Sequence, residues 1–130
     1  MRILIAEDDL PSRKVLQKYL GQFGECDIAV DGLETLDAFL EALNEEKPYD
    51  LVCLDIMMPK LDGLKALKAI RDIEKQKGIS ETGRVKIIMT TALNDKKTVM
   101  EAYDYGCEAY AWKPIDLEKL RQVLEKLQLI

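Results

Sequence analysis

The sequence contains no histidine among its 130 residues. Imidazole is the usual base beside a nucleophilic serine or cysteine, and it is the commonest ligand of transition metals. Its absence therefore excludes most sites of both kinds. Any chemistry in this chain must use carboxylates, hydroxyls, lysines and hard cations.

Cysteine is scarce, and long apolar runs are missing. The three cysteines, Cys26, Cys53 and Cys107, lie far apart, so we expect buried thiols rather than a zinc site or a redox pair. No segment approaches the ~18 apolar residues of a membrane span, and the N-terminus turns acidic too early for a signal peptide. We expect a cytoplasmic protein.

Basic residues are in the minority, with 19 lysines and arginines against 24 acidic residues and a net charge of -5. Such a balance argues against direct binding to nucleic acid. No Pro/Gly/Ser-rich linker interrupts the sequence, and this length suits one domain. We therefore expect a single domain over residues 1–130.

Short apolar runs alternate with segments of helical spacing. The runs lie at 2–6, 26–30, 50–54, 85–90 and 109–112. Strict alternation of this kind predicts a (βα)5 α/β fold, in which right-handed crossovers connect the strands of a parallel sheet covered by helices on both faces. The fourth helix is expected over 94–106, from Asn94 to Gly106. Residues 75–84 are expected to form a surface loop.

Polar side chains follow four of the five predicted strands. They are Glu7, Asp8 and Asp9 after the first, Asp55 after the third, Thr90 and Thr91 at the end of the fourth, and Lys113 and Pro114 after the fifth. In a parallel sheet the carboxyl ends of the strands meet at one edge, where ligands bind. Two carboxylates ~4 Å apart repel by about 4 kcal/mol at an effective dielectric constant near 20. Because of this repulsion, stability alone would not place several carboxylates at this edge of the sheet.

A hard divalent cation relieves that repulsion, because Mg²⁺ prefers carboxylate oxygens together with water and phosphate. Lys113 would add a second positive charge and Thr91 a hydroxyl donor. This combination suits a phosphoryl group, whose charge is spread over three oxygens. Asp55 is then the natural nucleophile, since an aspartate can carry a phosphoryl group as an acyl phosphate.

The chain resembles the receiver domains of two-component response regulators, and it is similar over its whole length to the single-domain chemotaxis type. The resemblance is carried by "ILIAEDD" at the first strand, "LDIMMPKLDG" around Asp55, "MTTA" at the fourth strand and "YAWKP" at the fifth. It implies a flavodoxin-like, doubly wound five-stranded sheet in the order 2-1-3-4-5.

The resemblance also implies a role for each matching residue. Asp55 is the implied phospho-acceptor, Asp8 the acid that binds Mg²⁺ directly, and Glu7 its companion, which reaches the metal through water. Met57 would give its backbone carbonyl to the metal. Arg13 aligns with a frequent family arginine, and this alignment leaves Asp9 outside the metal-binding pair.

The remaining implied roles belong to the fourth and fifth strands. Thr91 resembles the switch hydroxyl, Lys113 the phosphate-binding lysine, and Tyr110 the aromatic residue that changes rotamer on activation. Pro114 is expected to follow a cis Lys113–Pro114 bond.

The resemblance further implies a phosphorelay role, in which a histidine kinase or a histidine phosphotransfer protein phosphorylates the chain. The chain stops at Ile130, after the fifth predicted helix, so we expect no output domain. Output would then be contact with an unknown downstream protein through the face formed by residues 94–106, the fifth strand and the last helix. We expect a monomer with no enzymatic activity beyond its own phosphorylation and dephosphorylation.

Simpler interpretations of each feature stay open at this point. The acidic residues at 7–9 could form a solvated turn that caps the first helix, Asp55 could merely begin a loop, and Thr91 could cap the fourth helix. Tyr110 could be a core residue. The alternative functions are an aspartyl phosphatase or phosphotransferase, a flavin or nucleotide module, and a receiver-like scaffold that is no longer phosphorylated.

Sequence features bear on each alternative function. Aspartyl enzymes often carry a second acid two positions after the nucleophile, and Met57 stands there. No glycine-rich phosphate loop follows the first strand. The intact set of acids, threonine and lysine argues against a scaffold.

Met57 and Leu93 stand where the family often has polar residues near the attacking water, so we predict slow hydrolysis of the acyl phosphate.

Overall fold

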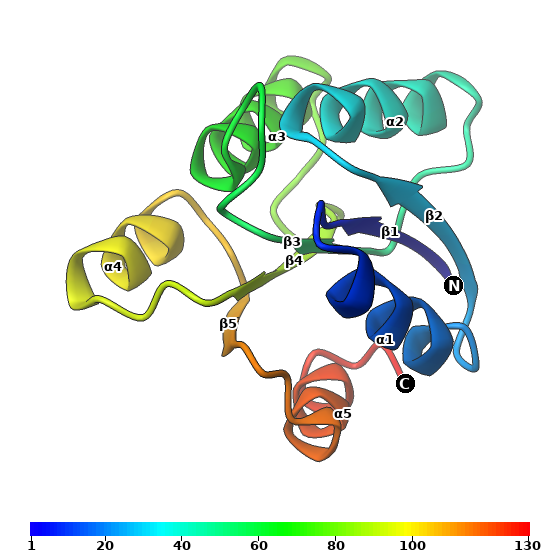
Figure 1. Cartoon of the computed structure of the whole chain (residues 1–130). Helices are drawn as coiled ribbons and strands as arrows, with labels where there is room; N and C mark the ends of the chain where they lie inside the picture. Colours follow the sequence, from blue (N-terminus) through cyan, green and yellow to red (C-terminus); the bar gives the residue numbers. More distant parts are fainter.

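A computed structural model describes all 130 residues, which form five strands alternating with five helices (Figure 1). The strands are β1 (Arg2–Ala6), β2 (Glu25–Ala29), β3 (Leu51–Leu54), β4 (Lys86–Thr91) and β5 (Ala109–Trp112). The helices are α1 (Leu10–Leu20), α2 (Gly32–Asn44), α3 (Gly63–Gln76), α4 (Lys96–Asp104) and α5 (Leu117–Lys126). None of these helices is both long and apolar enough to span a membrane.

The strands form one parallel sheet in the order β2-β1-β3-β4-β5. This order confirms the predicted flavodoxin-like, doubly wound α/β fold. The strand order reverses direction between β1 and β3, and the neighbouring carboxyl ends of β1, β3 and β4 form a crevice there. The residues that follow these strands are therefore brought together.

Helices cover both faces of the sheet, as Figure 1 shows. On one face α1 and α5 contribute Leu16, Leu20, Leu120 and Leu124 to a core shared with the strands. On the other face α2, α3 and α4 pack against a larger core that includes Phe39, Leu67 and Ala102. Strands β3 and β4 carry apolar side chains on both faces, because helices cover both faces of the sheet. Their sequences therefore read as continuous apolar runs.

Aspartate begins every helix. The N-cap residues are Asp9, Asp31, Asp62, Asp95 and Asp116, and each side chain accepts a hydrogen bond from a backbone N–H in the first helical turn. A carboxylate at this position satisfies an amide that has no partner within the helix, and it interacts favourably with the helix dipole.

Two predicted boundaries are wrong. Helix α4 is capped by Asp95 rather than Asn94 and ends at Asp104, because the Asp95 carboxylate accepts hydrogen bonds from the backbone and side chain of Thr98. Helix α3 continues through Lys75 and Gln76, so the loop that was expected over 75–84 begins at residue 77. Gly78, with φ of 73°, then takes the chain out of the helix.

Candidate functional site

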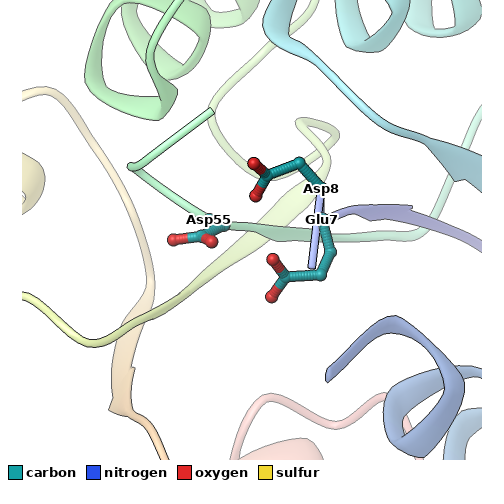
Figure 2. Close-up of side chains that lie close together, drawn as sticks. All are labelled: Glu7, Asp8 and Asp55. Carbon is teal, nitrogen blue, oxygen red and sulfur yellow. The ribbon is translucent and has the colours of Figure 1, made fainter. Parts of the chain in front are cut away.

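Three carboxylates gather at the carboxyl ends of β1 and β3. One oxygen from each of Glu7, Asp8 and Asp55 lies within 4.8 Å of the others, so the three are close enough to share one cation. Figure 2 shows consecutive residues after β1 supplying two of these side chains, while Asp55 comes from the end of β3. Glu7 and Asp55 are buried, with 0% and 3% exposed, whereas Asp8 is exposed. Like charges at this spacing are stable only with positive charge nearby.

Lys113 provides that charge from the end of β5. Its Nζ lies 2.5 Å from Glu7 Oε1 and 3.1 Å from Asp55 Oδ2. Burial lowers the pKa of the Lys113 ammonium, but contact with Glu7 and Asp55 outweighs burial and raises that pKa. Lys113 therefore stays charged and bridges two of the three acids.

Glu7 is the acid most affected by its surroundings. Burial is the largest cause and raises the pKa of Glu7 to about 7, with a further contribution from the neighbouring Asp55, while Lys113 opposes the change. The Lys113 ammonium is the one donor group close to Glu7 Oε1. A buried carboxylate with so few donors around it is well suited to a metal ion or to a water bound to one.

This raised pKa predicts how stability depends on pH. Between pH 4.5 and about 7 folded Glu7 holds a proton that the unfolded chain has lost, so the unfolding free energy falls as pH rises through that range. Glu7→Gln removes this dependence. The stability of the variant relative to the wild type should therefore increase by roughly 1 to 3 kcal/mol between pH 4 and pH 8.

Urea unfolding without divalent cations measures this difference. Glu81→Gln, at an exposed loop position, is the matched control and should show no such dependence. A difference between Glu7→Gln and the wild type that is constant with pH would contradict the prediction.

The Asp9 side chain points to the start of α1 and not to the other three carboxylates. Its Oδ2 accepts hydrogen bonds from the backbone N–H and the hydroxyl of Ser12, at 3.1 and 2.6 Å. These bonds are the main reason why the pKa of Asp9 is lowered. Asp9 therefore caps α1 and lies outside the three-carboxylate group, whereas its backbone N–H donates to Glu7 Oε2 at 3.2 Å.

The loop after β3 fixes the backbone around Asp55. The Met57 N–H donates to Asp55 Oδ1 at 3.3 Å, and the Gly63 N–H donates to the Ile56 carbonyl at 2.9 Å. A Cβ on residue 63 would lie 2.0 Å from the Asp55 carbonyl oxygen. Only glycine lets α3 begin so close to Asp55, which gives Gly63 a role in shaping the site.

An apolar groove of about 560 Å³ opens beside the acids. Asp8 lines it, together with Met57, Pro59, Leu64 and Leu93. The Met57 side chain is 60% exposed at its edge. Asp62 and Thr98 also line the groove, but the side chains of Met57 and Leu93 carry no strong hydrogen-bonding group that could orient a water molecule.

Thr91 and Tyr110 lie around the loop that follows β4. Thr91 is fully buried, and its hydroxyl accepts a hydrogen bond of 3.4 Å from the Leu93 N–H. Tyr110 is half-buried, and its hydroxyl donates to the Leu93 carbonyl at 2.6 Å. Burial raises the pKa of Tyr110 to about 12. Both side chains thus hold the same loop residue, which connects the site to α4.

The structure brings most of the predicted site residues together. Glu7, Asp8, Asp55 and Lys113 form one contact group, while Met57 and Thr91 lie on adjoining loop and strand ends. The Lys113–Pro114 bond is cis, the isomer that the resemblance implies. The direct contact of Lys113 with Glu7 was not predicted. The two residues follow β5 and β1, and these strands are separated in the sheet by β4 and β3.

Comparisons with known proteins agree with this geometry. The model of the response regulator receiver domain family matches residues 3–125. The chain is 36% identical to hybrid signal transduction histidine kinase I of Dictyostelium discoideum, over 95% of this chain and 7% of that protein. A probable histidine kinase 2 from Oryza sativa is 32% identical and is also much longer, since the chain spans 12% of its length.

Two solved structures show the same fold at 28% identity. One is the CheX–CheY complex with BeF3 and Mg²⁺ from Borrelia burgdorferi, with a TM-score of 0.81 over 98% of this chain and 89% of that chain. The other is the complex of the Saccharomyces cerevisiae phosphotransfer protein Ypd1 with the receiver domain of Ssk1, with a TM-score of 0.82 over 100% of this chain and 92% of that chain.

The parallel five-stranded sheet, its strand order and the family match over residues 3–125 together define the class of protein. The chain belongs to the response regulator receiver domain family. It is a receiver domain of the two-component and phosphorelay type.

Proposed function

We propose that Asp55 is the residue that accepts the phosphoryl group. The observation that carries this proposal is its position: a buried carboxylate at the end of β3, grouped with two further acids and contacted by Lys113 at 3.1 Å. An Asp55 oxygen attacks phosphorus, the bond between phosphorus and the donor's imidazole nitrogen breaks, and the imidazole takes up a proton. The product is an acyl phosphate on Asp55.

The acid group fits a magnesium ion, since it offers hard oxygens from three carboxylates, of which Glu7 and Asp55 are buried. Asp8, Asp55 and the Met57 carbonyl would hold the ion, with Glu7 reaching it through water. Bound Mg²⁺ supplies positive charge to the phosphoryl oxygens. Lys113 adds a second positive charge there, and Thr91 adds a hydroxyl donor.

Phosphorylation would act through the loop that Thr91 and Tyr110 share. Once the Thr91 hydroxyl turns to the phosphoryl group, it no longer accepts from the Leu93 N–H, and Tyr110 is free to turn inward. This shifts an existing equilibrium on the face formed by α4, β5 and α5. Met100, Tyr103 and Trp112 are about half exposed there, at 54%, 49% and 52%, and they provide apolar area for a downstream protein.

The partners follow from the same chemistry. A histidine kinase or a histidine phosphotransfer protein supplies the phosphoryl group, and an as yet unknown protein binds the α4-β5-α5 face. The complex of Ypd1 with the Ssk1 receiver domain supports a phosphotransfer protein as the donor. The domain works as a monomer, and its own chemistry is limited to self-phosphorylation and dephosphorylation.

Intact-mass measurement of the wild type tests the proposal. Acetyl phosphate with Mg²⁺ should add one phosphoryl group, and an excess of chelator should prevent the addition. Absence of an adduct at any Mg²⁺ concentration, in a protein that unfolds cooperatively, would contradict the proposed function.

The apolar groove predicts a long-lived acyl phosphate. Met57 and Leu93 neither orient nor readily admit water, so the double variant Met57→Asn, Leu93→Glu should shorten the half-life by about tenfold or more. The half-life is measured by intact mass after acetyl phosphate is removed. Met100→Asn, on exposed α4, is the matched control. Equal half-lives in wild type and double variant would count against a water-excluding role.

A further inference from the structure

Thr90 carries a buried hydroxyl with no hydrogen-bond partner. Its side chain is fully buried, and Thr90 Oγ1 has neither a hydrogen bond nor an ion-pair contact, whereas Glu7 Oε1, the other buried side-chain atom without a hydrogen bond, lies 2.5 Å from the Lys113 ammonium. Valine would fill the same space without leaving a polar atom unpaired. An unpaired buried hydroxyl destabilises a folded chain, so packing alone does not account for threonine at this position.

The Thr90 side chain lies on the same face of the sheet as Asp55 and Glu7. Successive side chains of a strand point to opposite faces, and Ile88 belongs to the core under α1 and α5, together with Cys53 and Ile5. Each of the three polar residues stands two positions beyond one of these apolar residues. Thr91 points to the opposite face.

Lys113 must cross this part of β4 to reach its partners. It follows β5, whereas its Nζ contacts Asp55 after β3 and Glu7 after β1, and β4 lies between β5 and β3. Thr90 is paired in register with Ala111, two residues before Lys113. Lys113 stands two positions beyond Ala111 on this face, so a lysine side chain that reaches from β5 to Asp55 and Glu7 passes the end of β4 next to Thr90.

We propose that Thr90 is a positioning residue for Lys113. This inference rests on the proposed phosphorylation of Asp55. An ammonium has three N–H donors, of which Glu7 and Asp55 engage two in the unphosphorylated protein. When Asp55 carries the phosphoryl group, Lys113 turns to a phosphoryl oxygen, and the Thr90 hydroxyl accepts one of its remaining N–H donors. The hydroxyl thereby holds the Lys113 ammonium next to the phosphoryl group.

Two variants separate the hydroxyl from the shape of the side chain. Thr90→Val keeps the shape and removes the hydroxyl, whereas Thr90→Ser keeps the hydroxyl. The rate of phosphorylation by acetyl phosphate, at saturating Mg²⁺, should fall about tenfold in Thr90→Val, the effect of one hydrogen bond to a charged group. Thr90→Ser should stay close to the wild type.

Two further measurements distinguish positioning from a general disturbance. Thr90→Val should be at least as stable to urea as the wild type, because it removes an unpaired polar atom, and its affinity for Mg²⁺ alone should be unchanged. Equal phosphorylation rates in Thr90→Val and wild type would overturn the inference, as would a parallel loss of Mg²⁺ affinity or a serine variant as slow as the valine variant. If the wild type itself gains no phosphoryl group, the proposed function fails instead.

Discussion

Asp55→Asn is expected to abolish phosphorylation by acetyl phosphate, while the protein remains folded. Asparagine has nearly the shape of aspartate, but its amide oxygen is a poor nucleophile at neutral pH. The substitution also removes one of three negative charges that lie within 4.8 Å of one another. Stability without Mg²⁺ should therefore be maintained, since Lys113 keeps its contact with Glu7.

The matched control is Asp72→Asn, on the exposed side of α3, which should be phosphorylated like the wild type. Intact mass after incubation with acetyl phosphate and Mg²⁺ provides the measurement. An Asp55→Asn protein that still gains one phosphoryl group at the wild-type rate would place the acceptor on another residue, such as Glu7 or Asp8 in the same acid group.

Arg71→Ala is expected to destabilise the fold by about 3 to 5 kcal/mol, the usual effect of removing one partner from a buried ion pair. Arg71 is 8% exposed, and it contacts Glu74 and Glu108 at 2.8 Å each. It also donates to the carbonyls of Val85 and Gly106. Its loss would leave two nearly buried carboxylates with less positive charge.

An exposed ion pair provides the control for this prediction. Arg121 and Glu125 on α5 lie 3.1 Å apart, and each side chain is 56% exposed, so Arg121→Ala should change stability by less than about 1 kcal/mol. Urea unfolding of both variants measures the two effects. Similar values for Arg71→Ala and Arg121→Ala would contradict the structural role of the buried group.

The sheet could be predicted because its strands are buried on both faces. Segments such as Leu51–Leu54 and Lys86–Thr91 read as apolar runs, and regular alternation with helices leaves few topologies for a parallel sheet. The gathering of Glu7, Asp8 and Asp55 follows from that topology. For this reason the acid group could be located from the sequence before its geometry was known.

Contacts that depend on side-chain direction could not be predicted. Lys113 reaches past β4 and β3 to Glu7, and the buried group around Arg71 joins residues up to 37 positions apart in the chain. Neither contact leaves a periodic signal in the sequence. The start of α4 is a different case, because Asp95 followed three residues later by Thr98 is a local capping pattern that the sequence does contain.

The most direct test of the central claim is to locate the phosphoryl group itself. Borohydride reduces an aspartyl phosphate to homoserine, which marks the acceptor residue permanently. Protein treated with acetyl phosphate and Mg²⁺, then reduced, digested and sequenced by tandem mass spectrometry, should carry homoserine at position 55 and at no other aspartate. Homoserine at position 8 or 9, or none in a protein whose mass had increased by one phosphoryl group, would contradict the assignment of Asp55 as the acceptor.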